Sequence, residues 1–357
     1  MARAELVVDR LVATGFIRPS VLWRGLQHSR PSFSHWGVGL LIGLSGLLVE
    51  PLAWLQSLLY AQRLRRVQLP DDPIVIIGHW RSGTTYLHQL LACDPVVATA
   101  RNTLTMAPQV ALLLQPWIAP LMKAWMTRVR PIDAVPWGPD DPQEDELGLA
   151  RLTFDTNMGG MAFPRDYLAN FRRHVLETST AYERQWLTFC RLTWLHDGAG
   201  KSHWLIKNSV HTARVRLVLK HFPRARFVLL RRSPVDSIRS LVQVKQRLGA
   251  LVGLQPLPDP PTQVEETATA HRELLEAFEA SRHLIPAQQL LELDYDDLIS
   301  QPLQAVEGIY THFDLTSWPV AEAPIKARID RARSYTADPV QLPPLAERRL
   351  QELVKAS

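Results

Sequence analysis

The sequence lacks the features that mark several large protein classes. Its 357 residues include two cysteines, Cys93 and Cys190, which are too few for a disulfide framework and fit a reducing cytosol. Neither cysteine lies at a metal-ligand spacing. Residues 1–35 mix five arginines with acids and short apolar groups, unlike a secretory signal. No internal repeat and no low-complexity segment is present. We therefore expect a cytoplasmic globular protein without a metal site.

The excess of positive charge does not take the form that nucleic-acid binding needs. The formal net charge is +5, but no run of Lys and Arg with interleaved aromatics occurs. A helix-turn-helix, zinc or RNA-binding signature is also missing. The positive charge is instead suited to a small polyanion. We expect a small-molecule partner and no nucleic acid.

An uninterrupted apolar run of bilayer-spanning length is missing as well. From Trp36 to Tyr60 the only charge is Glu50, and the unbroken part, residues 36–49, contains four glycines. A span needs about 20 residues, and Glu50-Pro51 is expected to break the run. Two interpretations stay open: an interfacial helix or hairpin on an acidic membrane face, or a buried helical cap on the core. A membrane span is less favoured. Three arginines follow the run: Arg63, Arg65 and Arg66.

One stretch has the pattern of an anion-binding loop. Residues 73–77 are apolar or proline, mostly β-branched, and predict a buried parallel strand. Gly78 and Gly83 bracket a tight loop, and Thr84 begins a helix. Backbone N–H groups and the helix dipole favour an anion there. Thr84 stands where a triphosphatase loop has Lys, and the cation lies inside the loop as Arg81. The loop is suited to a phosphate but poorly equipped to hold a metal.

Strands alternate with helices through the rest of the chain, which predicts an α/β fold with a central parallel sheet flanked by helices. Residues 1–69 are expected to form an N-terminal helical segment, and residues 70–357 the α/β domain. One expected strand ends in Lys207, and the next ends in Arg231 and Arg232. Expected strands cover residues 204–207, 225–232 and 289–293, and expected helices residues 171–195, 213–221 and 264–283, with another opened by Ser233-Pro234.

A cluster of acids lies upstream of these strands. Asp141 is a good N-cap and Pro142 fits a first helical position, so Glu144, Asp145 and Glu146 would lie in a first turn. Three successive acids exceed what capping needs, and a carboxylate is a natural general base for an alcohol. We favour a catalytic role over a capping role. Residues 95–140, rich in Pro, Trp, Met and Leu, could be helix core or the wall of an apolar pocket.

The loop residues resemble the 5′-phosphosulfate loop of sulfotransferases that use 3′-phosphoadenosine 5′-phosphosulfate (PAPS). Arg232 and Ser240, eight residues apart, resemble the 3′-phosphate motif of that family, and residues 294–298 resemble a stretch whose Tyr contacts the adenine end. The acid cluster resembles a signature of a bacterial branch that acts on lipid alcohols. The resemblance covers residues 70–315 and implies a P-loop-like three-layer fold. It implies PAPS binding by Arg81, Ser82, Gly83, Thr84, Thr85, Tyr86, Arg232, Ser240 and Tyr295.

The resemblance also implies which groups act on the transferred sulfuryl group. Lys207 matches the family's catalytic Lys by its position relative to both motifs, and Arg81 is a second cation for the developing charge. Many members have a His two residues after that Lys, but Ser209 occupies the position here. Glu144 is therefore the first candidate for the base. Glu146 is the second candidate and His211 the third.

The sequence thus predicts transfer of a sulfuryl group from PAPS to a lipophilic hydroxyl acceptor, with peripheral contact on the inner membrane face. Two other functions stay open. One is a P-loop nucleotide kinase or triphosphatase, which the missing Lys at Thr84 disfavours. The other is a non-catalytic, membrane-associated nucleotide-binding protein, which leaves Lys207 and the acid cluster unexplained. The sequence predicts no particular acceptor and no oligomeric state.

Overall fold

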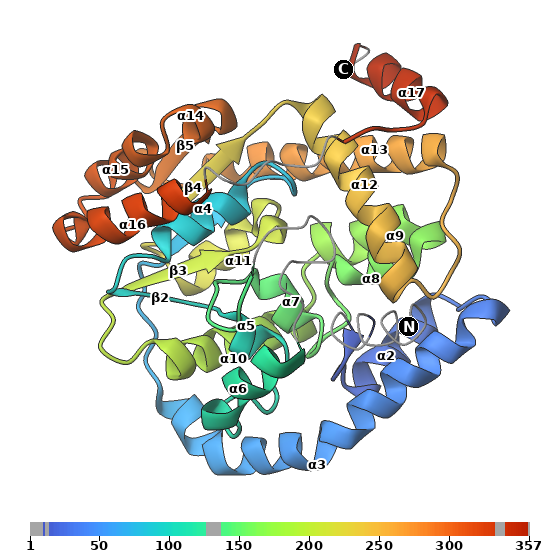
Figure 1. Ribbon diagram of the computed structural model, residues 1–357, viewed down its shortest axis with the longest axis horizontal. Coiled ribbons are helices and arrows are strands. Elements are labelled where there is room, and N and C mark those ends of the chain that lie inside the picture. Colours follow the sequence, from blue (N-terminus) through green and yellow to red (C-terminus); the bar gives the residue numbers. More distant parts are fainter. Residues whose placement is uncertain (1–9, 11–13, 126–136, 333–339, 356–357) are drawn as a thin grey trace.

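The computed structural model describes residue 10 and residues 14–125, 137–332 and 340–355 (Figure 1). Its strands are β1 (Ile74–Ile77), β2 (Val97–Thr99), β3 (His203–Lys207), β4 (Arg226–Arg231) and β5 (Leu290–Asp294). The helices before β3 are α2 (Pro19–His28), α3 (Trp36–Arg66), α4 (Thr84–Leu91), α5 (Asn102–Thr105), α6 (Gln115–Trp125), α7 (Asp145–Leu149), α8 (Met158–Ala162), α9 (Tyr167–Phe171) and α10 (Thr180–Asp197). Those after it are α11 (Val215–His221), α12 (Pro234–Val252), α13 (Pro260–Arg282), α14 (Tyr295–Ser300), α15 (Pro302–His312), α16 (Trp318–Ala332) and α17 (Pro344–Lys355).

The five strands form one parallel sheet in the order β2-β3-β1-β4-β5. All four strands expected from the sequence are present, which confirms the α/β class. Strands β1, β3 and β4 are largely buried on both faces, as is usual in parallel sheets, whereas the edge strand β5 is only partly buried. Val75 and Ile77 of β1 point into one apolar cluster with α10, whereas Ile74 and Ile76 point into another with α4, α15 and α16. Figure 1 shows α4 and α14–α16 together at one side of the sheet.

The register of the sheet brings the functional segments to one edge. In parallel strands all carboxyl ends lie at the same edge, where ligands of such sheets bind. Ile76 pairs with Lys207 of β3, so the phosphate loop and Lys207 leave the sheet side by side. Arg231 pairs with Asp294 of β5, which places the next residues along, Arg232 and Tyr295, beside each other.

Helix α3 is continuous over 31 residues, so the prediction that Glu50-Pro51 breaks the apolar run was wrong. Pro51 lies inside the helix and removes one backbone hydrogen bond. The Glu50 carboxylate forms a two-pronged ion pair with Arg18, whose Nε and Nη2 each lie 2.8 Å from a carboxylate oxygen. This pairing neutralises the charge within the run. By length and composition the helix could cross a membrane, although 33% of its most apolar window is buried.

Two other helices differ from the sequence prediction. The single helix expected over residues 171–195 is interrupted, because α9 ends at Phe171 and Ser179 starts α10 by accepting a hydrogen bond from the N–H of Tyr182 at 2.9 Å. The helix expected from residue 264 begins earlier, at Pro260. Proline is favourable in a first turn, and the side chain of Asp259 caps this helix by accepting from the N–H of Thr262 at 3.1 Å.

Candidate functional site

The loop after β1 has the backbone of a tight anion-binding turn. Gly78, Arg81 and Gly83 all adopt positive φ, at 134°, 68° and 93°. A Cβ atom at Gly83 would lie 2.6 Å from Cδ2 of Tyr295, so a side chain has no room there. Arg81 adopts a left-handed conformation that costs energy for a non-glycine residue and is concentrated at functional sites. The first helical residue, Thr84, is buried and starts α4 directly after the loop.

The start of the loop is fixed by a residue that sequence reasoning missed. The N–H of Gly78 donates to Oγ1 of Thr212 at 2.8 Å, and the same hydroxyl donates to the carbonyl oxygen of Gly78 at 3.2 Å. Thr212 ends the short helical turn Ser209–Thr212 after β3. The polar run from Asn208 to Thr212, directly after a buried strand, was the available signal. This contact joins the loop to the segment that carries Lys207.

Four of the predicted donor-binding residues meet at the middle of the loop. Nε of Arg81 donates to Oγ of Ser240 at 2.9 Å. Nη1 of Arg232 donates to the carbonyl oxygen of Arg81 at 2.8 Å, and its guanidinium carbon lies 4.1 Å from the ring centroid of Tyr295. Two guanidinium groups, a hydroxyl and a tyrosine from four chain segments therefore form one cluster at the carboxyl edge of the sheet.

Lys207 and Glu144 form an ion pair beside this cluster. Nζ of Lys207 donates to Oε2 of Glu144, and the N–H of Ser209 donates to Oε1 of the same carboxylate at 3.0 Å. Lys207 is buried, and Glu144 retains some exposure. The backbone N–H of Ser209 thus holds a carboxylate beside Lys207.

Glu146 is held two residues further along. Its carboxylate accepts from Nδ2 of Asn208 at 3.1 Å and from the N–H of Asn157 at 2.5 Å. Burial raises the pKa of Glu146 to about 7, although the charge of Arg214 opposes this shift. Burial, together with the charges of Glu144 and Glu146, also raises the pKa of Asp145 well above its ordinary value. The acid cluster therefore combines Glu144, paired with a cation, and two buried carboxyl groups that favour the protonated form.

The third base candidate lies in the core. His211 is fully buried, and its ring packs against Trp186 with centroids 5.0 Å apart. Neither ring nitrogen has a hydrogen-bond partner among the described residues. Burial and the charge of Arg214 lower the pKa of His211 to about 3. His211 is thus a much weaker base than a free imidazole.

The prediction that Asp141 caps the helix of the acid cluster was wrong. Helix α7 begins at Asp145, and Glu144 is its N-cap residue without a side-chain cap. Asp141 instead accepts from the N–H of Gly138 at 2.7 Å, and Pro142 forms an isolated bridge with Arg101. This pairing draws residues 142–144 into an extended segment, so the helix begins later.

The remaining predicted residues divide between the loop and the core. Oγ of Ser82 donates to the carbonyl oxygen of His79 at 2.7 Å, and Tyr86 packs against the apolar cluster under α4. Many apolar side chains of residues 95–125 lie in the main core rather than around an open cavity. The core members there include Met106, Ala111, Leu112, Ile118 and Met122. Met126 and Pro136 lie outside the described residues.

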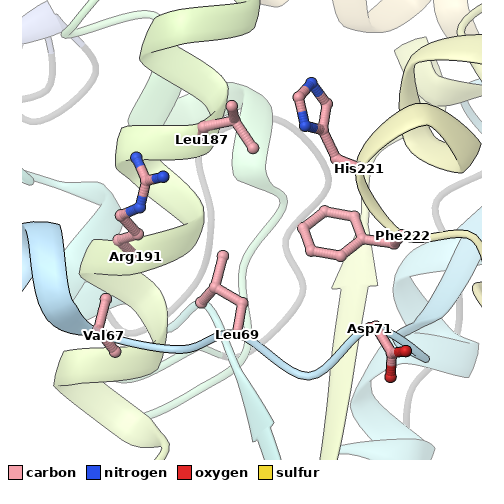
Figure 2. A pocket seen from close by; sticks show the side chains of 7 residues that line it. All are labelled: Val67, Leu69, Asp71, Leu187, Arg191, His221 and Phe222. Carbon is pink, nitrogen blue, oxygen red and sulfur yellow. The ribbon is translucent and has the colours of Figure 1, made fainter.

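A separate hollow of about 210 Å³ lies at the opposite edge of the sheet (Figure 2). It is bounded by the segment before β1, by α10 and by the end of α11. Asp71 and Phe222 precede β1 and β4, so this hollow lies at the amino ends of the strands. The phosphate loop and Lys207 follow the carboxyl ends. The hollow is therefore no part of the candidate site.

The chain is similar to known proteins along most of its length. The sulfotransferase family profile matches residues 73–319. The omega-hydroxy-beta-dihydromenaquinone-9 sulfotransferases Stf3 of Mycobacterium bovis and Mycobacterium tuberculosis are each 25% identical over 311 residues, which covers 85% of this chain and 77% of theirs.

Two solved structures share the fold. Sulfotransferase STF9 from Mycobacterium avium aligns with a TM-score of 0.66 and 17% identity over 94% of both chains. Sulfotransferase STF1 from Mycobacterium tuberculosis aligns with a TM-score of 0.66 and 19% identity over 94% of this chain and 90% of its own. Since the family profile covers more than half of the chain, the protein belongs to the sulfotransferase family and is an enzyme of that type.

Proposed function

We propose that the protein transfers a sulfuryl group from PAPS to the hydroxyl of a lipophilic acceptor. The observation that carries this proposal is the joining of Arg81, Ser240 and Arg232 by hydrogen bonds at the sheet edge where Lys207 also emerges. PAPS carries a 5′-phosphosulfate and a 3′-phosphate, and two guanidinium groups together with a helix N-terminus suit two anionic ends.

The residues of the loop fit the donor. Because Gly83 has no Cβ, the turn can pack directly against the ring of Tyr295. The helix that follows leaves its first N–H groups without intrahelical partners, so they can bind an anion. We assign the 5′-phosphosulfate to residues 81–86 and the 3′-phosphate to Arg232 and Ser240. Tyr86 and Tyr295 are assigned to the adenine end. Positive charge at these positions offsets the negative charge of the donor.

Lys207 is assigned to the transferred group. Bound at this edge, PAPS supplies a sulfuryl group and a phosphate leaving group. The S–O bond to the phosphate breaks while a new S–O bond to the acceptor forms, so negative charge grows on the former bridging oxygen. A lysine ammonium has three donors, so Lys207 can stabilise that oxygen and still contact Glu144. Fixed cations of this kind lower the barrier because they need no reorganisation.

Glu144 is assigned as the base that takes the acceptor proton. Its carboxylate is held by both Lys207 and the N–H of Ser209, which fixes its position beside the transferred group. Glu146 is the second candidate, with a pKa raised to about 7 by burial that would strengthen its basicity. His211 ranks third because its pKa of about 3 leaves it weakly basic.

The acceptor is assigned to the class of lipophilic alcohols and phenols. The mycobacterial relatives are named for a hydroxylated menaquinone, and this chain matches them along most of its length. The segment that joins α5 to α6 is apolar and leads from Glu144's neighbours toward α3. Transfer of apolar surface from water is favourable by about 25 cal/mol per Å², so an acceptor that enters beside this segment would gain from being lipophilic rather than a sugar.

Two measurements test the proposal separately. In the first, 3′-phosphoadenosine 5′-phosphate should raise the melting temperature more than Mg²⁺-ATP does. The reverse order would remove the donor assignment. In the second, labelled PAPS is incubated with a lipid extract or with soluble sugars, and Lys207→Met serves as the inactive control. We expect the label to appear in the organic phase of the incubation with the lipid extract. Turnover with sugars alone would remove the acceptor class and leave the donor site intact.

A further inference from the structure

Helix α3 presents an apolar face that no described part of the chain covers. Ten of the sixteen exposed large apolar side chains of the described residues lie between Phe33 and Leu59. Leu48 is 80% exposed and Trp54 67% exposed. They recur at helical spacing and define the α3 face. Its members are Phe33, Trp36, Leu40, Leu44, Leu47, Leu48, Leu52, Trp54, Leu58 and Leu59. A contiguous apolar surface of this kind marks an interaction site.

The neighbouring helices α6 and α2 also carry exposed apolar side chains. Trp117 and Leu121 of α6 are 67% and 56% exposed, and Trp23 of α2 is 64% exposed. Helix α6 begins two residues after Leu113, whose N–H donates to Oε1 of Gln56 in α3 at 3.1 Å. In Figure 1, α3 follows the rim of the molecule as an arc with α2, α5 and α6 on its inner side.

The opposite side of α3 is anchored to the body of the enzyme along its length. Val38 and Ile42 pack with α2, Val49 and Ala53 with Ala107 and Val110, and Tyr60 against the main core. Nε2 of Gln56 donates to the carbonyl oxygen of Pro108 at 2.9 Å. A helix that crosses a bilayer would have to leave these partners. The geometry therefore favours a helix that lies in the plane of an interface.

The charges around the α3 face indicate an anionic partner. Residues 14–66 contain six arginines and one acid, Glu50, which is already paired with Arg18. Arg63, Arg65 and Arg66 at the end of α3 are exposed, as is Lys123 of α6. Basic residues beside an apolar face are attracted to anionic lipids. Two copies of the chain would instead bring two surfaces of the same sign together, which is unfavourable.

We propose that the α3 face and its flanking basic residues dock this enzyme on an anionic lipid bilayer, with α3 in the plane of the membrane surface. The inference deepens the proposed function and rests on it in one respect, the route of the acceptor. Gln56 contacts Pro108, while Asn102 Oδ1 accepts from Nε2 of Gln143 at 2.9 Å, next to Glu144. Residues 102–108 thus connect the α3 face with the neighbours of the proposed base, so the proposal places the entry of a lipid alcohol on the bilayer side of the molecule.

Vesicle co-sedimentation of the full chain tests the docking without using activity. Wild-type protein should bind phosphatidylcholine vesicles that contain phosphatidylglycerol, and the binding should weaken with salt. Leu48→Glu combined with Trp54→Glu should lower the partition coefficient by about tenfold or more, since both side chains would leave the interface. Val320→Glu combined with Leu345→Glu adds the same charge at exposed apolar residues of α16 and α17. This control should change binding by less than about twofold, because both helices lie away from α3 (Figure 1) and the effect of a charge fades beyond about one Debye length.

A second measurement needs no disruptive substitution. Brominated lipids should quench tryptophan fluorescence of the wild-type protein, and Trp54→Phe should remove part of that quenching. Wild-type protein that ignores anionic vesicles would overturn the proposal, as would membrane-bound protein that resists extraction by alkaline carbonate, which indicates a span. A dimer in solution that Leu48→Glu with Trp54→Glu separates into monomers would assign the face to a second copy and overturn it as well.

The docking and the proposed chemistry can fail independently. Calorimetry with 3′-phosphoadenosine 5′-phosphate should give the same affinity for the face variant and for wild type, because α3 lies away from the phosphate loop. Activity on a water-soluble phenol should also persist in the face variant, whereas activity on an acceptor in vesicles should fall. Loss of nucleotide binding in wild type would count against the donor site, and loss of vesicle binding alone against the docking.

Discussion

Lys207 and Glu144, 63 residues apart in the chain, are joined by a hydrogen bond from Nζ of the lysine to Oε2 of the glutamate. The same carboxylate accepts the N–H of Ser209 at 3.0 Å. A cation and a carboxylate with opposite proposed tasks, charge stabilisation and proton removal, therefore hold each other in place. Substituting each partner should separate the two tasks.

Lys207→Met should reduce kcat by about 10²–10³, the scale for removing one preorganised donor from developing negative charge. Affinity for 3′-phosphoadenosine 5′-phosphate should change less, because the product lacks the sulfuryl group. Steady-state kinetics and calorimetry measure the two effects. A variant with unchanged kcat and a raised KM for the donor would make Lys207 a binding cation instead.

Glu144→Gln should lower kcat by about 10²–10⁴, the range for loss of a positioned general base. The amide can still accept a hydrogen bond from the N–H of Ser209, so folding should persist. Glu183→Gln is a suitable control, since it changes an acid paired with Lys220 on the surface. If Glu144→Gln keeps full activity while Glu146→Gln loses it, the base is Glu146.

Arg232→Ala should weaken binding of 3′-phosphoadenosine 5′-phosphate by about 1.5–3 kcal/mol, the range for a hydrogen bond to a charged group. Arg231→Ala is the matched control, because Arg231 pairs with Glu279 and Glu292 rather than with the loop. Titration calorimetry at two salt concentrations checks both. Equal affinities in the two variants would remove the 3′-phosphate assignment.

Gly83→Ala should disrupt the loop. The φ of 93° is unfavourable for alanine, and its Cβ would lie 2.6 Å from the ring of Tyr295. Gly308→Ala in α15 meets nothing within 4 Å and should stabilise the protein by about 0.5–1 kcal/mol, the helix preference of alanine over glycine. Nucleotide affinity and thermal unfolding are the measurements. Normal nucleotide binding by Gly83→Ala would show that this turn does not form the donor site.

Glu146 should make the stability of the protein fall as pH rises from about 4.5 to about 7. Its ordinary pKa is 4.5 and its folded pKa about 7, so within this window the folded state keeps a proton that the unfolded chain has released. The loss is at most about 3.5 kcal/mol, at about 1.4 kcal/mol per pKa unit. Glu146→Gln does not titrate, so its free energy of unfolding should decline less across the window than that of wild type.

The buried histidines have the opposite effect on the pH dependence of stability, and this effect cancels when the two proteins are compared. Burial lowers the pKa of His211 to about 3 and that of His271 to about 4. Their contribution to stability is present above their ordinary pKa and is lost as pH falls. Because it is common to wild type and Glu146→Gln, the difference between the two proteins isolates Glu146. If the free energies of unfolding of wild type and Glu146→Gln change with pH in parallel across this window, the raised pKa of Glu146 is contradicted.

The sequence by itself determined four of the five strands and the loop, whereas the three-residue strand β2 (Val97–Thr99) was not predicted. β-branched runs such as residues 74–77 fit a strand buried on both faces, and Gly83 with Thr84 determines where the turn ends and the helix begins. These are local effects, since side-chain shape and backbone freedom act within a few residues. For the same reason the spacing between Arg232 and Ser240 could be read directly from the chain.

The tertiary structure decided the contacts between distant segments. Nothing near Glu144 in sequence indicates that the backbone of Ser209 holds its carboxylate, and nothing near Gly78 indicates Thr212. Helix α3 continues through Pro51 because packing and the pair of Glu50 with Arg18 outweigh a local break. Which side of α3 stays exposed depends on what packs against the other side. Composition measures how apolar a helix is, but only the fold determines the direction in which its apolar side chains point.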